Sequence, residues 1–178
     1  MTRYAVLVRG INVGRAHRIA MAELRELLTA EGHRAVRTLL QSGNVVLESE
    51  LSPGELTPSV ERALERRFGF PVPTVVRTAD ELLAVVGKDP LGPVATDPAR
   101  YVVSFFAGAV PAELEQRLRS VDPVDDEFRV DGRELYLWCP HGQLQSPLSA
   151  ALGKHRTGPV GTARNWSTVL KLADLVQR

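Results

Sequence analysis

The order of apolar segments in residues 1–78 restricts the fold of this chain more than any other feature of its sequence. Short apolar runs alternate there with stretches in which apolar residues recur at helical spacing. The predicted order is strand, helix, strand, strand, helix, strand, at residues 4–8, 22–31, 35–40, 45–47, 58–68 and 71–77. Gly32 is expected to end the first helix, and Thr57 is expected to cap the second, with Pro58 as its first residue. This is the order of a ferredoxin-like unit.

The rest of the chain repeats much of this pattern. After a short helix from residue 78 and a linker rich in proline and glycine at 89–98, we expect a strand, a helix, a hairpin around Asp131-Gly132, a brief helix and an amphipathic C-terminal helix. These lie at 101–106, 111–120, 128–138, 146–152 and from 166 onward, with 157–163 extended or in a loop.

The predicted fold class is therefore α+β, with two ferredoxin-like lobes, antiparallel sheets and a C-terminal helix. The N-terminal lobe is expected at 1–78, a connecting helix and linker at 79–99, and the C-terminal lobe at 100–178.

Composition and motifs exclude several classes of function. The single cysteine rules out an internal disulfide, and the four histidines show no metal-ligand spacing. The apolar runs are too short for a membrane span or a secretory signal, so a soluble cytoplasmic protein without a membrane partner is expected. The spacing of Gly10 and Gly14 matches neither a dinucleotide fingerprint nor a P-loop. Cofactors are not indicated, and neither a catalytic residue nor an oligomeric state is identified.

The predicted topology brings two polar segments together. In a sheet of this order the third strand lies between the first two, so the loop at 10–19 and the hairpin at 41–44 share one edge. Glycines in both segments permit positive φ and close approach of a ligand to the backbone. The alternative is that Asn12 braces its loop and Asn44 serves the hairpin turn.

Charge is distributed unevenly although the net charge is only +1. Residues 1–18 hold four arginines and no acid, and residues 151–178 are also basic, whereas 111–134 are rich in acids. The two basic ends would form an anion-attracting surface if they met in space. Arg15, His17 and Arg18 add positive charge close to a predicted helix N-terminus, where anions are favoured.

A third polar segment precedes the C-terminal helix. Asn165 is a suitable N-cap for that helix, and Arg164 beside the free N–H groups of the first turn could bind a phosphate or carboxylate. The alternative is that Asn165 only caps the helix while Arg164 pairs with a surface acid. A pairing of Cys139 with His141 is a weaker candidate, because neighbouring positions on an extended segment point to opposite sides.

Three strings, at 7–14, 41–45 and 162–169, together resemble the DUF1697 family of uncharacterised bacterial proteins. The resemblance implies a two-lobed α+β protein with ferredoxin-like parts and supplies no established activity. This chain has Arg15, Ala16, Ala20, Pro147 and Ser167 where the family pattern usually has glycine, lysine, proline, lysine and asparagine. Arg18 matches a basic position of the pattern.

Our leading hypothesis is a protein that binds an anionic small molecule or nucleotide in a cleft between the lobes. The alternatives are a nucleic-acid-associated protein that contacts backbone phosphates and a non-catalytic protein interaction module. The expected ligand-binding residues are Arg9, Gly10, Asn12, Gly14, Arg18, Gln41, Ser42, Gly43, Asn44, Arg164 and Asn165.

Overall fold

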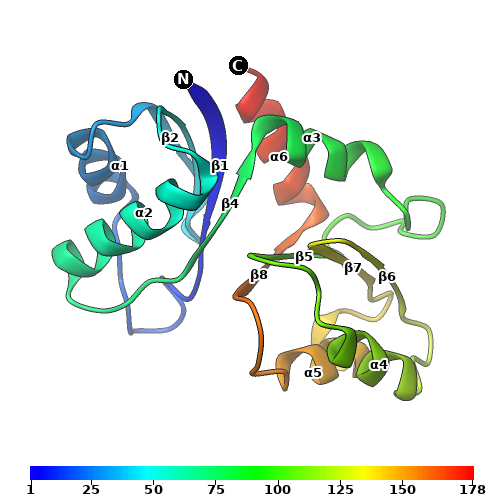
Figure 1. The fold of residues 1–178 in the computed structure, drawn as a ribbon. Helices are drawn as coiled ribbons and strands as arrows, with labels where there is room; N and C mark the ends of the chain where they lie inside the picture. Colours follow the sequence, from blue (N-terminus) through cyan, green and yellow to red (C-terminus); the bar gives the residue numbers. More distant parts are fainter. The chain divides into compact units, whose positions relative to one another are not determined.

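Two four-stranded antiparallel sheets organise the chain, which the computed structural model describes from residue 1 to residue 178 (Figure 1). Contacts divide the chain into a first unit, Met1–Ala84 with Lys171–Arg178, and a second unit, Val85–Leu170. The division differs from the expected one at the C-terminus, because the last residues group with the first unit. There Arg3 donates a hydrogen bond from Nη1 to the carbonyl oxygen of Val176 at 2.9 Å.

The first unit has the predicted ferredoxin-like arrangement. Its sheet has the strand order β2-β3-β1-β4, and β3 pairs antiparallel with both β1 and β2. The strands β1 and β2 therefore run parallel with β3 between them, which places their ends at the same edge. The elements are β1 (Thr2–Val8), α1 (Met21–Ala30), β2 (Arg34–Leu39), β3 (Asn44–Ser49), α2 (Pro53–Phe68), β4 (Thr74–Thr78) and α3 (Ala79–Lys88), which continues into the second unit.

The core of the first unit lies between one face of this sheet and the helices α1 and α2 (Figure 1). Alternate residues of β1 point to it, because side chains along a strand alternate between the two faces. Tyr4, Val6 and Val8 are buried there with Leu24 and Leu64 from the helices. Burial of each large apolar side chain contributes about 1.5–3 kcal/mol.

Helix α2 begins earlier than the sequence suggested. We expected Thr57 and Pro58 to start it, but its N-cap is Ser52 and Pro53 is its first residue. The N–H and the hydroxyl of Ser52 both donate to Glu55 Oε2, at 3.0 and 2.6 Å. These hydrogen bonds stabilise the ionised carboxylate and lower the pKa of Glu55. Ser52 and Glu55 therefore form the cap that begins α2, and Pro58 lies inside the helix.

The second unit has the same sheet order in its own strands, β6-β7-β5-β8. The segment expected to be extended or in a loop contains a true edge strand, β8, which pairs antiparallel with β5. The hairpin loop consists of Gly132 and Arg133 rather than Asp131 and Gly132. The reason is that Asp131 is the last residue of β6 and lies opposite Glu134, the first residue of β7, in the antiparallel sheet. The elements are β5 (Tyr101–Phe106), α4 (Ala112–Ser120), β6 (Glu127–Asp131), β7 (Glu134–Trp138), η1 (Gln143–Gln145), α5 (Pro147–Gly153), β8 (Gly161–Asn165) and α6 (Trp166–Gln177), which ends in the first unit. None of the helices in the chain combines the length and the apolar character needed to cross a membrane.

A buried histidine follows the glycine that ends α1. Gly32 has a φ of +93°, and the N–H of His33 donates to the carbonyl of Leu28 at 3.2 Å, which confirms the expected glycine cap. His33 is 5% exposed, with Nδ1 3.1 Å from Ser49 Oγ and Nε2 without a hydrogen-bond partner. Burial lowers the pKa of His33, and the nearby charge of Glu31 opposes this only in part.

This burial predicts acid sensitivity. Because the folded pKa lies below the unfolded value of about 6.5, the unfolded chain takes up the proton first. The stability that His33 contributes is complete above pH ~6.5 and is lost as pH falls through that value toward the folded pKa, by about 1.4 kcal/mol for each unit between the two pKa values. Urea unfolding at pH ~7.5 and ~5.5 should show a smaller pH dependence for His33→Gln than for the wild type. An equal pH dependence in both proteins would contradict the prediction.

Candidate functional site

The loop after β1 lies against the β2–β3 hairpin, as the topology predicted. The N–H of Val8 donates to the carbonyl of Gly43 at 2.8 Å, and the N–H of Arg9 donates to the carbonyl of Pro73 at 2.9 Å. The side-chain amide of Asn12 reaches the carbonyl of Gln41 at 2.7 Å. Two of the three polar segments singled out from the sequence therefore meet at one edge of the first unit's sheet.

The glycines in these segments have different roles. Gly43 has a φ of +83°, and a Cβ there would lie 2.8 Å from Val8 Cβ and 2.9 Å from Ile11 Cδ1. The close packing of loop on hairpin therefore requires glycine at this position. Gly10 and Gly14 also have positive φ, +72° and +64°, but a Cβ on either would meet nothing within 4 Å. Their backbone faces open space that a ligand can approach.

Asn12 braces the loop. Its Nδ2 donates to the carbonyls of Ile19 and Gln41 at 2.9 and 2.7 Å, and its Oδ1 accepts from the N–H of Ile19 at 2.8 Å. Both amide hydrogens are thus used within the protein. Asn12 itself adopts a φ of +55°, a left-handed conformation that asparagine tolerates better than most residues.

Asn44 is fully buried and serves the hairpin. Its Nδ2 donates to the carbonyl of Leu39 at 2.9 Å and to Ser42 Oγ at 3.0 Å. The turn has positive φ at Leu40 and Gly43, +60° and +83°, and not at Asn44. Gln41 and Ser42 are exposed at the hairpin's tip. The turn interpretation therefore accounts for the side-chain contacts of Asn44.

The exposed part of the loop carries a concentration of positive charge. Ile11 and Ile19 are buried and anchor the loop at 2% and 1% exposure, while residues 13–18 between them are exposed. Arg9, Arg15 and Arg18 all belong to this exposed surface, and residues 9–20 contain no acid. The guanidiniums of Arg9 and Arg15 make no hydrogen bond or ion pair, and Arg18 donates only to the carbonyl of Gly14 at 3.2 Å.

The start of helix α1 adds to this electropositive character. Its N-cap, Ala20, has no side chain that accepts from the free N–H groups of the first turn. An uncapped helix N-terminus favours negative charge. Glu23 in that turn is already paired with Arg67, Oε1 to Nη2 at 2.8 Å.

An aromatic stack supports one side of the loop, and sequence reasoning did not find it. The rings of His17 and Phe70 are stacked, with centroids 4.3 Å apart and an angle of 16° between their planes. The sequence signal for this contact was weak, because Phe70 lies just beyond the glycine that ends α2.

The third polar segment belongs to the second unit. Asn165 Oδ1 accepts from the N–H of Thr168 at 2.9 Å, which confirms the predicted cap of α6. Arg164 lies on β8, is 8% exposed, and donates from Nη1 to Thr162 Oγ1 at 2.8 Å. Burial lowers its pKa to about 10. The guanidinium of Arg164 is therefore withdrawn from solvent, not displayed at the helix start.

Cys139 and His141, the weaker candidates for a thiol–imidazole pair, do not form such a pair. Cys139 is fully buried, and burial raises the pKa of its thiol. His141 is exposed and holds Asp125 instead, with Nε2 2.7 Å from Oδ2. No cluster of three histidine, cysteine, aspartate or glutamate side chains that could hold a metal ion is present.

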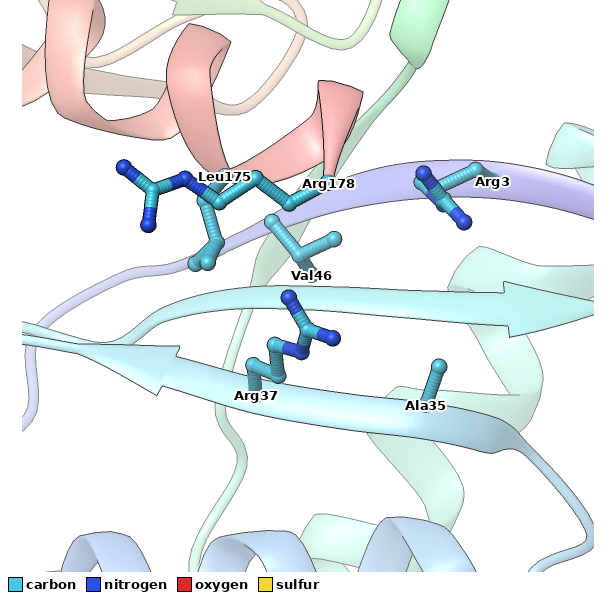
Figure 2. Close-up of a pocket in the computed structure, with 6 residues that line it drawn as sticks. All are labelled: Arg3, Ala35, Arg37, Val46, Leu175 and Arg178. Carbon is cyan, nitrogen blue, oxygen red and sulfur yellow. The ribbon is translucent and has the colours of Figure 1, made fainter.

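The two basic ends meet in the first unit, at a small hollow of about 10 Å³ (Figure 2). Such a volume holds one water molecule and no larger ligand. Arg3 pairs with Glu48 and Arg178 with Asp174, both at 2.6 Å, so only Arg37 lacks an acidic partner. The lining residues are Arg3, Ala35, Arg37, Val46, Leu175 and Arg178.

The packing at Gly43 yields a stability prediction. Gly43→Ala should destabilise the protein by about 2–4 kcal/mol, because the added methyl group meets Val8 and Ile11 and the residue has positive φ. Gly10→Ala is the matched control, with similar φ and open space, and should cost only about 1 kcal/mol. Urea unfolding compares the two, and equal losses would show that close packing at Gly43 is unimportant.

The cap at Asn165 yields a second stability prediction. Asn165→Ala should lower the free energy of unfolding by about 1 kcal/mol, since the N–H of Thr168 loses its acceptor, while Asn165→Asp should retain most of the stability. Thermal unfolding of the three proteins tests this, and an unchanged midpoint for the alanine variant would contradict the cap's contribution.

Comparison with known proteins assigns the chain to a family. It matches the family described as "Protein of unknown function (DUF1697)" over residues 1–136. It is also similar to a solved structure, the conserved bacterial protein SP0830 from Streptococcus pneumoniae, with a TM-score of 0.82, 25% identity and 98% of each chain covered. None of the curated proteins matches it. Because the family match covers residues 1–136 of the 178, the chain belongs to the DUF1697 family.

Proposed function

We propose that this protein binds an anionic small ligand, bearing phosphate or carboxylate groups, on the loop at 9–20. The observation that carries the proposal is the set of three exposed arginines, Arg9, Arg15 and Arg18, on a loop without any acid or acidic partner. Guanidinium groups form paired, charge-assisted hydrogen bonds with phosphates and carboxylates. An anion would supply the acceptors that the protein itself does not provide.

The fixed shape of the loop supports this proposal. Asn12 ties the loop's two ends to each other and to the hairpin, and Ile11 and Ile19 anchor it in the core. Such a loop loses little conformational freedom when a ligand binds, so more of the interaction energy appears as affinity. The exposed backbone at Gly10 and Gly14 and the uncapped start of α1 offer further N–H donors.

We propose a narrower set of ligand-binding residues than the one expected from the sequence. Asn12, Gly43 and Asn44 build the site, and Asn165 caps a helix, so we give them no direct role. Arg164 is left out because its guanidinium is buried and donates to Thr162 Oγ1. The proposed contacts are made by Arg9, Gly10, Gly14, Arg15 and Arg18, with Gln41 and Ser42 at the margin.

The alternative of binding nucleic-acid phosphates is less well supported. Its best site is the arginine hollow of Figure 2, where the two basic ends meet. Glu48 and Asp174 already neutralise two of its three arginines. Arg37 is the remaining cation there, and it provides a matched control because it is also exposed and lacks an acidic partner.

The proposal predicts anion binding that depends on the loop. Isothermal titration with inorganic pyrophosphate should detect binding by the wild type, and Arg15→Ala or Arg18→Ala should weaken it about tenfold each, as expected for loss of a charge-assisted hydrogen bond. Arg37→Ala should leave the affinity unchanged. Citrate serves as the carboxylate probe in the same titration. If the wild type binds neither pyrophosphate nor citrate, the proposal is rejected. A loss confined to Arg37→Ala would favour the nucleic-acid alternative.

A further inference from the structure

The stack of His17 on Phe70 is the end of a longer row of planar groups. The ring of Phe70 lies 6.4 Å from that of Phe68, and the guanidinium of Arg67 lies 5.5 Å from the Phe68 centroid. Arg67 is itself held by the ion pair with Glu23. Phe68 and Phe70 also pack against the core of the first unit. The support beneath His17 is therefore formed by the end of α2 and by Phe70 just after it, and it is anchored to the core.

His17 is held in an unfavourable backbone conformation at the exposed end of this row. Its φ is +52°, and its carbonyl accepts from the N–H of Asn12 at 3.1 Å, which closes the loop. The stack is the only interaction that the structure gives its side chain. Because the residue is exposed and one ring face lies on Phe70, the opposite face is the one that solvent reaches. Backbone conformations of this kind cluster at ligand-binding sites.

The open ring face lies on the same short loop as the arginines. Arg15 and Arg18 flank His17 in the sequence, and all three side chains are exposed. A ring face and a cationic group so arranged match a ligand that carries both a flat ring and an anion. Inorganic phosphate or a simple carboxylic acid would leave the ring face unused.

We infer that the ligand of this loop is a small nucleotide, with its base stacked on the open face of His17 and its phosphate held by the loop's arginines. The inference rests on the proposed anion-binding function and adds the class of ligand. Stacking of a nucleobase on an aromatic side chain tolerates any base, because each base has a π-face. The structure accordingly assigns base recognition to His17 and anion recognition to Arg15 and Arg18.

The experiment compares AMP with ribose 5-phosphate, which has the same sugar and phosphate but no base. Both titrations use the same buffer and pH, so the two ligands differ only in the base. The wild type should bind AMP about tenfold more tightly than ribose 5-phosphate. His17→Asn should remove this preference and leave the affinity for ribose 5-phosphate unchanged. Asparagine tolerates the positive φ, so the loop is retained without the ring.

A second variant keeps the test decisive if His17→Asn alters the fold, which thermal unfolding would reveal. Phe70→Leu keeps an apolar side chain against the core but removes the ring beneath His17, and it should reduce the preference for AMP. Equal binding of AMP and ribose 5-phosphate by the wild type would overturn the inference and leave the proposed anion binding intact. An equal loss for both ligands in His17→Asn would also overturn it. Binding of neither ligand would overturn the inference, and the titration with pyrophosphate would then decide whether the proposed anion binding stands.

Discussion

The packing of Gly43 against Val8 and Ile11 is the contact on which the candidate site depends. It lets the hairpin lie directly on the residues that follow β1, and the N–H of Val8 donates to the carbonyl of Gly43. Any side chain at this position would push the two segments apart. With them in contact, Asn12 reaches the hairpin and fixes the course of the loop.

This bracing explains why the arginines of the loop are available. The side-chain amide of Asn12 makes hydrogen bonds on the inner side of the loop, and the buried Ile11 and Ile19 anchor it in the core. The arginines are therefore not needed to hold the loop in place. Several other arginines of the first unit are paired with acids. Arg66 lies 2.5 Å from Glu31, and Arg67 lies 2.8 Å from Glu23. The loop differs from those places because residues 9–20 contain no acid.

Prediction from the sequence succeeded where a local pattern and the fold agree. The strand at 101–106 has the predicted bounds, and the order of strands and helices in the first unit is as expected. The start of α2 was placed too late, because a proline five residues into a helix resembles a helix start while Ser52 and Glu55 make the actual cap. The strand β8 was missed because its sequence is polar and it owes its conformation to pairing with β5.

For the site, the sequence by itself determined which segments are polar, which positions permit positive φ, and that two of the segments share an edge, since the order of strands in a ferredoxin-like sheet leaves no other arrangement. Only the tertiary structure decided which of those polar groups face inward. In the sequence, Asn12, Asn44 and Arg164 resemble residues that bind ligands. In the structure, their side chains donate hydrogen bonds to neighbouring groups of the protein instead. The stack of His17 on Phe70 joins residues more than fifty positions apart and depends on the packing of α2. A contact between distant residues leaves no periodicity or spacing along the chain, so it emerges only when the chain is folded.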